Sequence, residues 1–571
     1  MFVELYTPQG DVLANNPGLQ PWQSHPQPQM KRESWLNLNG EWEFTSVGGP
    51  ALLPVDYDLK IRVPFCPESA LSGIKEHFEE GQPLYYRRKF TLPEDFNRGR
   101  VLLHIGAADQ IADIYVNQTH LCHHEGGYEA FTVDITQALT DGENVLEVIC
   151  RDDLNNQAFP YGKQTMDRGG MWYTPVSGIW QTVWLESVPE IYIKKLSIEN
   201  RGGTVTIDTG DEGLSGQVFV KGLGGYPLLA GKARITPAAP HFWRPEDPYL
   251  YEFSIEAEED RVESYFALRS LEINQVGGYR RLCLNGKPYF FHGLLDQGYW
   301  PEGLLTAPAP ECYEQDILAM KRLGFNTLRK HIKVEPEEFY YQCDRLGMVV
   351  FQDMVNNGDY KYVRDTVIPT IGLQVWPDEK MHPDPVIRQG FLDGMTAAVN
   401  QLKNHPCICC WTIFNEGWGQ FDSDSVYEQF RELDDTRFID TTSGWFRRKK
   451  TDVDSRHVYF REVKLKAGGK PLVLSEFGGY AYKVQGHSFN PDDTYGYGKY
   501  QDLNAFSAAL EKLYMEQVVP NARAGLCAAI YTQVSDVEDE TNGLVTYDRR
   551  VEKLKPERML PIAQALQKAV E

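Results

Sequence analysis

The sequence predicts a multidomain chain with two all-β parts followed by one α/β part, on three observations. The chain has 571 residues, which at roughly 150 residues per domain suggests three to four domains. Short apolar or alternating runs separated by turn residues fill the first half, as β-strands do. After Leu282, apolar runs alternate with amphipathic helical stretches, the pattern of parallel strands joined by helices.

The first predicted domain covers residues 1–190. Strands are expected at 101–105, 111–116, 144–149 and 178–186, with turn residues such as those at 140–143 between them. Short strands at this spacing favour a jelly-roll sandwich.

The second predicted domain covers residues 191–275. Strands are expected at 204–207, 217–220 and 250–255, and glycines are dense between them. A stretch of roughly 80 residues with this pattern suits a small immunoglobulin-like sandwich.

The third predicted domain covers residues 276–571. Helices are expected at 313–323, 336–346 and 385–403. The eight strand candidates are 289–293, 327–331, 348–352, 407–414, 438–440, 457–460, 472–475 and 525–531. Eight β/α repeats over about 290 residues predict a TIM barrel.

Composition limits the partners that we expect. The 80 acidic and 57 basic residues give a net charge of −23, which disfavours nucleic acid and anionic membranes. The first 16 residues lack a basic and an apolar region, and no apolar run approaches 18 residues. The ten cysteines include no CxxC pair, so buried free thiols are favoured over a zinc or redox site. We therefore expect a cytoplasmic protein.

Two glutamates follow predicted barrel strands. Glu416 comes just after strand four and Glu476 just after strand seven, at the end of a barrel where catalytic groups lie. Two carboxylates at one site are what glycoside hydrolysis requires, one as a proton donor and one as a nucleophile or base. The alternative for each glutamate alone is a strand-end ion pair with Lys or Arg.

These residues carry a resemblance to a known family. Asn415-Glu416 and Glu476 resemble the catalytic motifs of glycoside hydrolase family 2, the family of β-galactosidases, β-glucuronidases and β-mannosidases. Segments 35–44, 177–186, 242–251 and 326–331 resemble other stretches of that family in the same order. The likeness covers essentially the whole chain.

The resemblance implies an exo-acting, retaining β-glycosidase without a cofactor. Glu416 would be the general acid/base and Glu476 the nucleophile, and retention places such carboxyl groups about 5–5.5 Å apart. The magnesium-site pattern of large β-galactosidases is not reproduced around Asp353, so no catalytic metal is expected.

The resemblance also implies roles for residues around the two glutamates. Asn415 would bond the sugar 2-hydroxyl, Arg329 would pair with Glu476, and Tyr459 would bond the same carboxylate. The other substrate-binding candidates are His331, Asp296, Gln297, Trp300, Trp418, Trp445, Asp167, Asp353 and Lys333. For each candidate ordinary packing or ion pairing is the alternative, and for Asp353 it is a buried structural carboxylate.

The sequence favours a neutral sugar and therefore a β-galactosidase-like activity. The Asn-x-Lys expected of β-glucuronidases is missing from the acidic stretch 536–544, and a carboxylate substrate needs a cation. Lys330 and Lys333 keep a β-glucuronidase or β-galacturonidase open, with β-mannosidase or furanosidase behind. A non-catalytic carbohydrate-binding protein is the alternative of another class. The family is often oligomeric, so a homo-oligomer is an open expectation.

Overall fold

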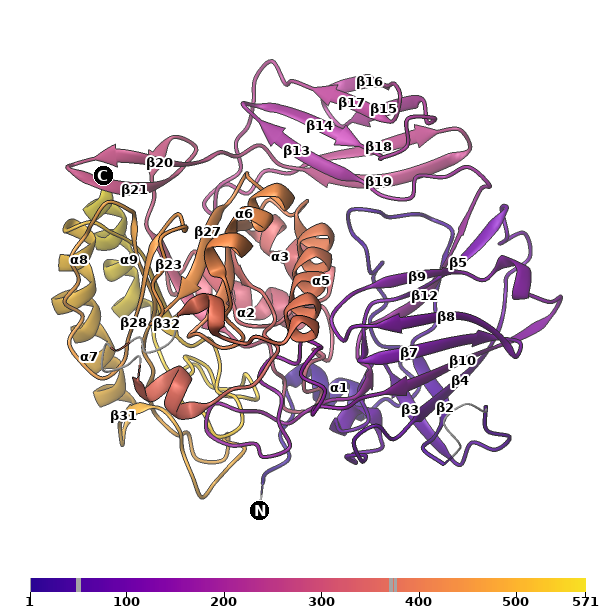
Figure 1. Ribbon diagram of the computed structural model, residues 1–571, viewed down its shortest axis with the longest axis horizontal. Coiled ribbons are helices and arrows are strands. Elements are labelled where there is room, and N and C mark those ends of the chain that lie inside the picture. The colour runs from indigo at the N-terminus through magenta and orange to yellow at the C-terminus, as the bar shows by residue number, and fades with distance from the viewer. Residues whose placement is uncertain (1, 48–52, 369–372, 374–376) are drawn as a thin grey trace.

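The computed structural model describes residues 2–47, 53–368, 373 and 377–571. It contains two antiparallel sandwiches followed by a parallel barrel. In Figure 1 the indigo and purple sandwich lies beside the barrel, and the magenta sandwich lies across the top of both. The predicted fold class is confirmed.

The first sandwich packs a four-stranded sheet against a six-stranded sheet. The first sheet runs β1 (Trp35–Asn37), β12 (Val183–Val188), β5 (Arg100–Ile105), β9 (Phe131–Asp134). The second runs β3 (Leu59–Val63), β2 (Gly40–Thr45), β4 (Leu84–Thr91), β10 (Glu143–Arg151), β7 (Ile111–Val116), β8 (Thr119–Glu125). Buried and partly exposed residues alternate along β7, because successive side chains point to opposite faces of a strand.

One predicted strand of this domain is wrong. Segment 178–186 forms two strands in different sheets, β11 (Gly178–Ile179), which pairs with β6 (Ala108–Asp109), and β12. The chain crosses between the sheets at Trp180, whose buried indole donates to the carbonyl of Gly127 at 2.8 Å. An alternating pattern can continue unchanged where the chain passes from one sheet to another. The pattern therefore does not reveal the change of sheet.

The second sandwich has seven strands in two sheets around its own apolar core. The sheets are β13 (Ser197–Arg201), β14 (Thr204–Asp208), β17 (Lys232–Ile235) and β16 (Gly224–Leu228), β15 (Gly216–Val220), β18 (Tyr251–Ala257), β19 (Asp260–Phe266). A three-stranded sheet of β20 (Leu271–Val276), β21 (Tyr279–Leu284) and β22 (Lys287–Pro288) follows. The expected boundary at 275/276 falls inside β20.

The barrel is a nearly closed sheet of eight parallel strands. Its order is β27 (Phe438–Ser443), β26 (Ile408–Asn415), β25 (Val349–Asp353), β24 (Thr327–Lys330), β23 (Phe291–Asp296), β32 (Leu526–Thr532), β29 (Leu472–Gly478), β28 (Asp454–Val458). β26 is buried along its whole length, as expected of a strand covered on both faces.

Helices cover the outside of the barrel (Figure 1). They are α2 (Glu311–Arg322), α3 (Glu337–Leu346), α5 (Pro385–Leu402), α6 (Ser423–Leu433), α7 (Leu503–Leu513), α8 (Val519–Arg523) and α9 (Pro556–Val570), while α1 (Pro8–Ala14) precedes the first sandwich and the pair β30 (Tyr480–Ala481) and β31 (Tyr497–Lys499) follows β29. Within the described ranges, no helix has the length and apolar character needed to span a bilayer.

Strand limits differ from the predictions where catalytic candidates lie. β26 ends at Asn415 and β29 runs through Glu476, so the second glutamate lies within its strand. β28 lies earlier than the predicted 457–460, so Tyr459 comes just after it. All ten cysteines are free thiols, and only Cys122 is not fully buried.

Arg32 joins the N-terminal segment to both sandwiches. Its guanidinium pairs with Glu186 of β12 and with Asp260 of β19, both at 2.9 Å, and it donates to the carbonyl of Ile193 at 2.7 Å. All three charged side chains are nearly inaccessible to solvent. A buried cation with two carboxylates contributes to stability only while the set is complete.

Replacing Arg32 with Met is expected to lower the free energy of unfolding by about 3–5 kcal/mol, because two buried carboxylates lose their cation. Chemical denaturation measures the change. Arg100→Met is the matched control, since Arg100 pairs with Asp134 and Glu190 while 41% exposed, and it should leave the free energy of unfolding nearly unchanged. Equal losses for the two variants would contradict this role of Arg32.

Candidate active site

Glu416 lies on a strained turn at the carboxyl end of β26. Its φ is +53°, a region that non-glycine residues occupy at a cost of about 1–3 kcal/mol. Its N–H donates to the carbonyl of Ser443 in β27 at 2.9 Å. Gly417 follows with φ +78°, and a Cβ there would lie 2.2 Å from the ring of Phe446. The turn holds the Glu416 side chain at 19% exposure.

Glu476 is the more buried of the two glutamates, at 6% exposure. Its Oε1 accepts from Arg329 Nη1 at 3.0 Å and its Oε2 accepts from the Tyr459 hydroxyl at 2.6 Å. Burial opposes ionisation, but the charges of His457 and Arg329 and the Tyr459 hydrogen bond outweigh it, so the pKa of Glu476 lies well below its ordinary value. Glu476 is therefore a carboxylate at neutral pH.

The two glutamates face the same point, with His457 beside them. One oxygen of Glu416, one of Glu476 and Nδ1 of His457 all lie within 4.8 Å of one another. His457 Nδ1 is 2.7 Å from Glu416 Oε1 and 3.6 Å from Glu476 Oε2. Because the carboxyl ends of the barrel strands meet at one edge, two carboxyl groups from residues 60 positions apart lie together.

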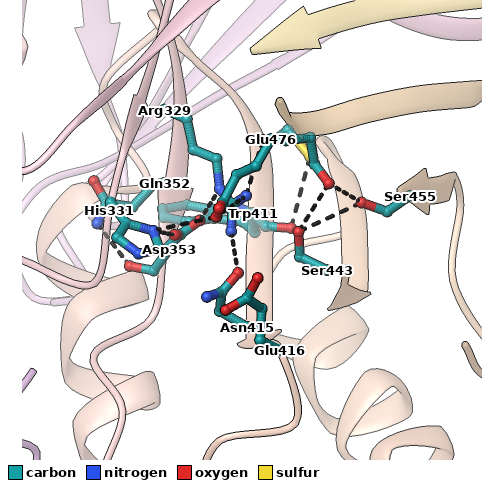
Figure 2. Close-up of polar contacts among 12 residues, drawn as sticks. Arg329, His331, Gln352, Asp353, Trp411, Asn415, Glu416, Ser443, Ser455 and Glu476 are labelled. Atoms are coloured by element: carbon teal, nitrogen blue, oxygen red, sulfur yellow. Dashed lines mark hydrogen bonds and ion pairs between the residues drawn. The ribbon is translucent and has the colours of Figure 1, made fainter. Parts of the chain in front are cut away.

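Arg329 on β24 is the centre of the polar cluster (Figure 2). Its guanidinium donates to Asp353 Oδ1 at 2.9 Å, to Glu476 Oε1 at 3.0 Å and to Asn415 Oδ1 at 2.8 Å. The side chain is 1% exposed. Arg329 holds the amide oxygen of Asn415. The amide nitrogen of Asn415 is therefore the group that can contact a ligand.

Asp353 and His331 form a buried pair beside Arg329. His331 Nδ1 lies 2.7 Å from Asp353 Oδ2, and both side chains are 1% exposed. Arg329 and His331 outweigh burial and lower the pKa of Asp353. Asp353 therefore matches the buried structural carboxylate weighed as its alternative, while His331 lies 4.0 Å from Glu476 Oε1.

His457 was not among the predicted site residues, although it lies within a predicted strand. A hydroxyl chain holds its other face: Nε2 is 3.0 Å from Ser443 Oγ, which donates to Ser475 Oγ at 3.1 Å. Ser455 Oγ lies 2.6 Å from the same Ser475 oxygen. In the sequence, His457 and the three serines look like ordinary strand residues. Nothing in the sequence therefore indicated that they form a cluster.

Lys333 does not fit its predicted substrate contact. Its ammonium is buried and donates to the carbonyls of Gly298 and Leu305 at 2.5 and 2.7 Å, and it pairs with Glu335 at 2.9 Å. All three donors of the ammonium are thereby used. Burial lowers its pKa to about 8, against the opposing charge of Glu335.

Asp296 and Lys330 also form an ion pair with each other. Lys330 Nζ lies 2.7 Å from Asp296 Oδ2 and 2.9 Å from Glu335 Oε1. Asp296 Oδ1 accepts from the N–H of Gly298 at 3.0 Å. Gln297 is buried directly after this strand end. The two lysines that kept an acidic sugar open in the sequence are therefore committed to internal partners.

The three tryptophan candidates differ in their surroundings. Trp300 is buried edge-on to Tyr313 and below the Arg549 guanidinium, so packing accounts for it. Trp418 is buried against Trp172, with ring centroids 5.0 Å apart. Trp445 is partly exposed and lies 5.6 Å edge-on from His457, the histidine that contacts Glu416.

The loop 161–174 of the first sandwich reaches the barrel. The Tyr161 hydroxyl donates to the carbonyl of Gly358 at 2.6 Å, and Arg168 pairs with Glu538 at 3.1 Å. Asp167 on this loop is exposed. Tyr497, absent from the predicted set, packs on Tyr459 with ring centroids 4.6 Å apart.

The cluster of Glu416, His457 and Glu476 also has the donor types of a divalent metal site. The Arg329 guanidinium 3.0 Å from Glu476 opposes a second cation at the same carboxylate. We therefore interpret the three side chains as an acid–base constellation.

Family models match most of the chain. "Glycosyl hydrolases family 2, TIM barrel domain" matches residues 278–560, and "Glycosyl hydrolase 2 galactose-binding domain-like" matches residues 71–168. Among curated proteins, a β-galactosidase of Thermoanaerobacter pseudethanolicus is 23% identical over 432 residues, which cover 70% of this chain and 53% of that protein. The chain spans about half the length of the curated relatives it matches.

Solved structures share the whole architecture. The β-D-glucuronidase of Dictyoglomus thermophilum has a TM-score of 0.71 and 19% identity, over 95% of this chain and 98% of that chain. A β-galacturonidase from Eisenbergiella tayi bound to galacturonate has a TM-score of 0.68 and 18% identity, over 96% and 99%. These likenesses show a shared fold.

Replacing Arg329 with Met is expected to lower the free energy of unfolding at pH 7 by about 3–5 kcal/mol, since Asp353 and Glu476 lose their cation. Both carboxyls have lowered pKa values in the fold, so their contribution is present above about pH 4 and is lost as the pH falls. The difference between variant and wild type should therefore shrink below pH 4.

Urea unfolding at several pH values measures this difference. Arg447→Met is the control, because Arg447 pairs with Asp454 at 3.2 Å while 56% exposed, and it should cost less than about 1 kcal/mol. A difference for Arg329→Met that stays constant with pH would contradict the charge pairing.

Proposed function

The chain belongs to glycoside hydrolase family 2, and from this membership we propose that it is a retaining exo-β-glycosidase acting on terminal β-linked sugars. The observation that carries the proposal is the pair Glu416 and Glu476, with carboxyl oxygens within 4.8 Å. Retaining enzymes hold their carboxyl groups about 5–5.5 Å apart, whereas inverting enzymes leave roughly 6.5–9.5 Å for a water. Exo action rests on the habit of the family.

In the first step Glu476 is the nucleophile. Its carboxylate oxygen bonds to the anomeric carbon while the bond from that carbon to the leaving oxygen breaks. Glu416 gives its proton to the leaving oxygen, and the aglycone departs as a neutral alcohol. The product of the step is a covalent glycosyl ester on Glu476.

In the second step Glu416 changes from acid to base. It takes a proton from an incoming water, whose oxygen bonds to the anomeric carbon as the ester bond to Glu476 breaks. The sugar leaves with its original configuration after two inversions. The Glu416 side chain is 19% exposed, so it can exchange protons with water between the steps.

The neighbouring residues position and ionise the nucleophile. Arg329 and Tyr459 each donate to one Glu476 oxygen, which keeps the carboxylate ionised and limits its rotation. His457 Nδ1 lies 2.7 Å from Glu416 Oε1 and so holds the acid/base carboxyl in place. Asn415 has its amide nitrogen for the sugar 2-hydroxyl, where contacts strengthen in the transition state.

Two sugar classes have specific support. The name of the Thermoanaerobacter relative, a β-galactosidase, and the missing Asn-x-Lys favour a neutral sugar. The names of the two solved neighbours, a β-glucuronidase and a β-galacturonidase, favour a uronic acid. β-Mannosidase and furanosidase activities have no such support. A non-catalytic carbohydrate-binding role is disfavoured because it needs neither the proton donor nor the ionised nucleophile.

Glu476→Gln is expected to lower kcat for nitrophenyl β-glycosides by more than about 10³-fold, because it removes the nucleophile. Glu416→Gln should lower kcat about 10²–10⁴-fold on substrates with poor leaving groups, the usual worth of a general acid, and less on nitrophenyl substrates. Added azide should restore turnover of Glu416→Gln and yield a β-glycosyl azide.

Initial rates and product analysis by NMR measure these effects. Glu462→Gln, at an exposed glutamate just after β28, is the control and should keep wild-type rates. Wild-type turnover by Glu476→Gln would overturn the assignment of the nucleophile. Hydrolysis of no glycoside by the wild type would favour the binding role.

His457→Gln is expected to move the acid limb of kcat/KM to higher pH. The His457 charge helps to lower the pKa of Glu476, so its loss raises that pKa and the nucleophile protonates at a less acidic pH. Tyr459→Phe should shift the limb less, because it removes one neutral hydrogen bond. Rate profiles from pH 3 to 8 measure the limb, and an unmoved limb in His457→Gln would contradict this role.

A further inference from the structure

Lys163 is a cation beside the site without an anionic partner. It belongs to the loop 161–174 of the first sandwich and is partly buried. Its side chain contacts the face of Tyr173, where Nζ lies 5.9 Å from the ring centroid. Within the described residues, Lys163 has no ion pair or side-chain hydrogen bond.

The backbone before Lys163 is seated on the carboxyl end of the barrel. The N–H groups of Tyr161 and Gly162 donate to the carbonyl of Asn356 at 3.0 and 3.3 Å. Gly162 has φ +64°, and a Cβ there would lie 3.1 Å from the carbonyl oxygen of Ile332. Only a glycine allows this close approach, which places Lys163 next to the chain that follows β24.

His331 connects Lys163 to the nucleophile. Burial lowers the pKa of His331 and the Lys163 charge lowers it further, as expected where a second positive charge lies in the neighbourhood. His331 in turn lies 4.0 Å from Glu476 Oε1. Lys163 therefore stands one side chain away from the group that attacks the sugar.

The three cations on and just after β24 already have anions. Arg329 is paired with Asp353 and Glu476, and the two lysines that follow it are paired with Asp296 and Glu335. Among the residues that the structure describes, Lys163 has no anionic partner and is therefore available to an anionic ligand.

The carboxylate that the Tyr173 hydroxyl contacts is also occupied. Glu540 accepts from the Tyr173 hydroxyl, from Gln533 at 2.9 Å and from Asn542 at 3.5 Å. Its oxygens are thus held by neutral donors, and it makes no ion pair with Lys163 within 4.0 Å.

We propose that Lys163 binds the carboxylate of a terminal uronic acid and so makes the substrate a β-uronide, an inference that rests on the proposed glycosidase function. A partly buried ammonium is stabilised more by a negatively charged ligand group than by a neutral one. The hydroxymethyl group of a neutral hexose offers no charge. A carboxylate at the same ring position makes a charge-assisted hydrogen bond with Lys163 and completes the charge pairing around the barrel end.

The proposal reverses the neutral sugar that the sequence favoured. That expectation rested on the missing Asn-x-Lys in the stretch 536–544, with Lys330 and Lys333 of the barrel as the candidate cations. Lys163 lies more than 160 residues before β24 and comes from another domain, so only the docking of the loop brings it to the site.

The test compares wild type with Lys163→Gln on matched substrate pairs, the nitrophenyl β-D-glucuronide with the β-D-glucoside and the β-D-galacturonide with the β-D-galactoside. The wild type should prefer a uronide to its neutral partner. Lys163→Gln should lower kcat/KM for the uronides about 10- to 100-fold, the usual worth of a hydrogen bond between charged groups. Neutral glycosides should change less than about twofold.

Two further variants sharpen the test. Lys163→Arg keeps the positive charge and should retain most uronide activity, while Lys163→Gln does not. Lys194→Gln is the matched control, since exposed Lys194 likewise lies 5.9 Å from a tyrosine ring, that of Tyr192, and it should behave as wild type. A wild type that prefers neutral glycosides, or an equal loss on both members of a pair in Lys163→Gln, would overturn the proposal.

Binding separates this inference from the proposed hydrolysis. Calorimetry with sodium glucuronate and sodium galacturonate, against glucose and galactose at matched ionic strength, needs no turnover. If the wild type hydrolyses nothing but binds a uronate more tightly than Lys163→Gln does, hydrolysis falls and Lys163 keeps its role. If the wild type shows no preference for the uronates, the Lys163 proposal falls whether or not glycosides are hydrolysed.

Discussion

The buried guanidinium of Arg329 is the interaction on which the site depends. It lies 1% exposed among side chains from three other strands, Asp353 of β25, Asn415 of β26 and Glu476 of β29. A planar guanidinium has five donors in a fixed geometry, so one residue can set the positions of all three partners. The arrangement also has a cost, because each charge in this interior is stable only while the others are present.

The same cluster separates the properties of the two glutamates. Glu476 is buried among positive charges and donors that keep it ionised. Glu416 stands on a strained turn with positive φ, is more open to solvent and contacts His457. Two residues of the same type thereby differ in exposure and in charged neighbours, the difference on which the proposed roles of nucleophile and proton donor rest.

The site draws on the first sandwich as well as the barrel. The loop 161–174 is fastened to the barrel end by Tyr161, Gly162 and Arg168. It brings Lys163 toward His331 and packs Trp172 against Trp418. The barrel thus supplies both glutamates, while a loop from another domain adds the charge that we assign to sugar recognition.

The sequence by itself determined the fold class, the two glutamates and the partners of Glu476. Apolar runs place both glutamates near the carboxyl ends of barrel strands, although the strand limits differ by a few residues, and the carboxyl ends of parallel strands meet at one edge. Glu416 and Glu476 could therefore be placed together, and family motifs indicated Arg329 and Tyr459 beside them. The structure has both in contact with Glu476.

Only the tertiary structure decided which charges remain free. Lys333 is a candidate ligand in sequence but is neutralised by Glu335 in the fold. His457 reads as a strand residue until Ser443 and Glu416 are seen on either side of it. The availability of Lys163 depends on packing between distant segments. Charge pairing is set by distances through space, and the order of residues in the sequence does not encode those distances directly.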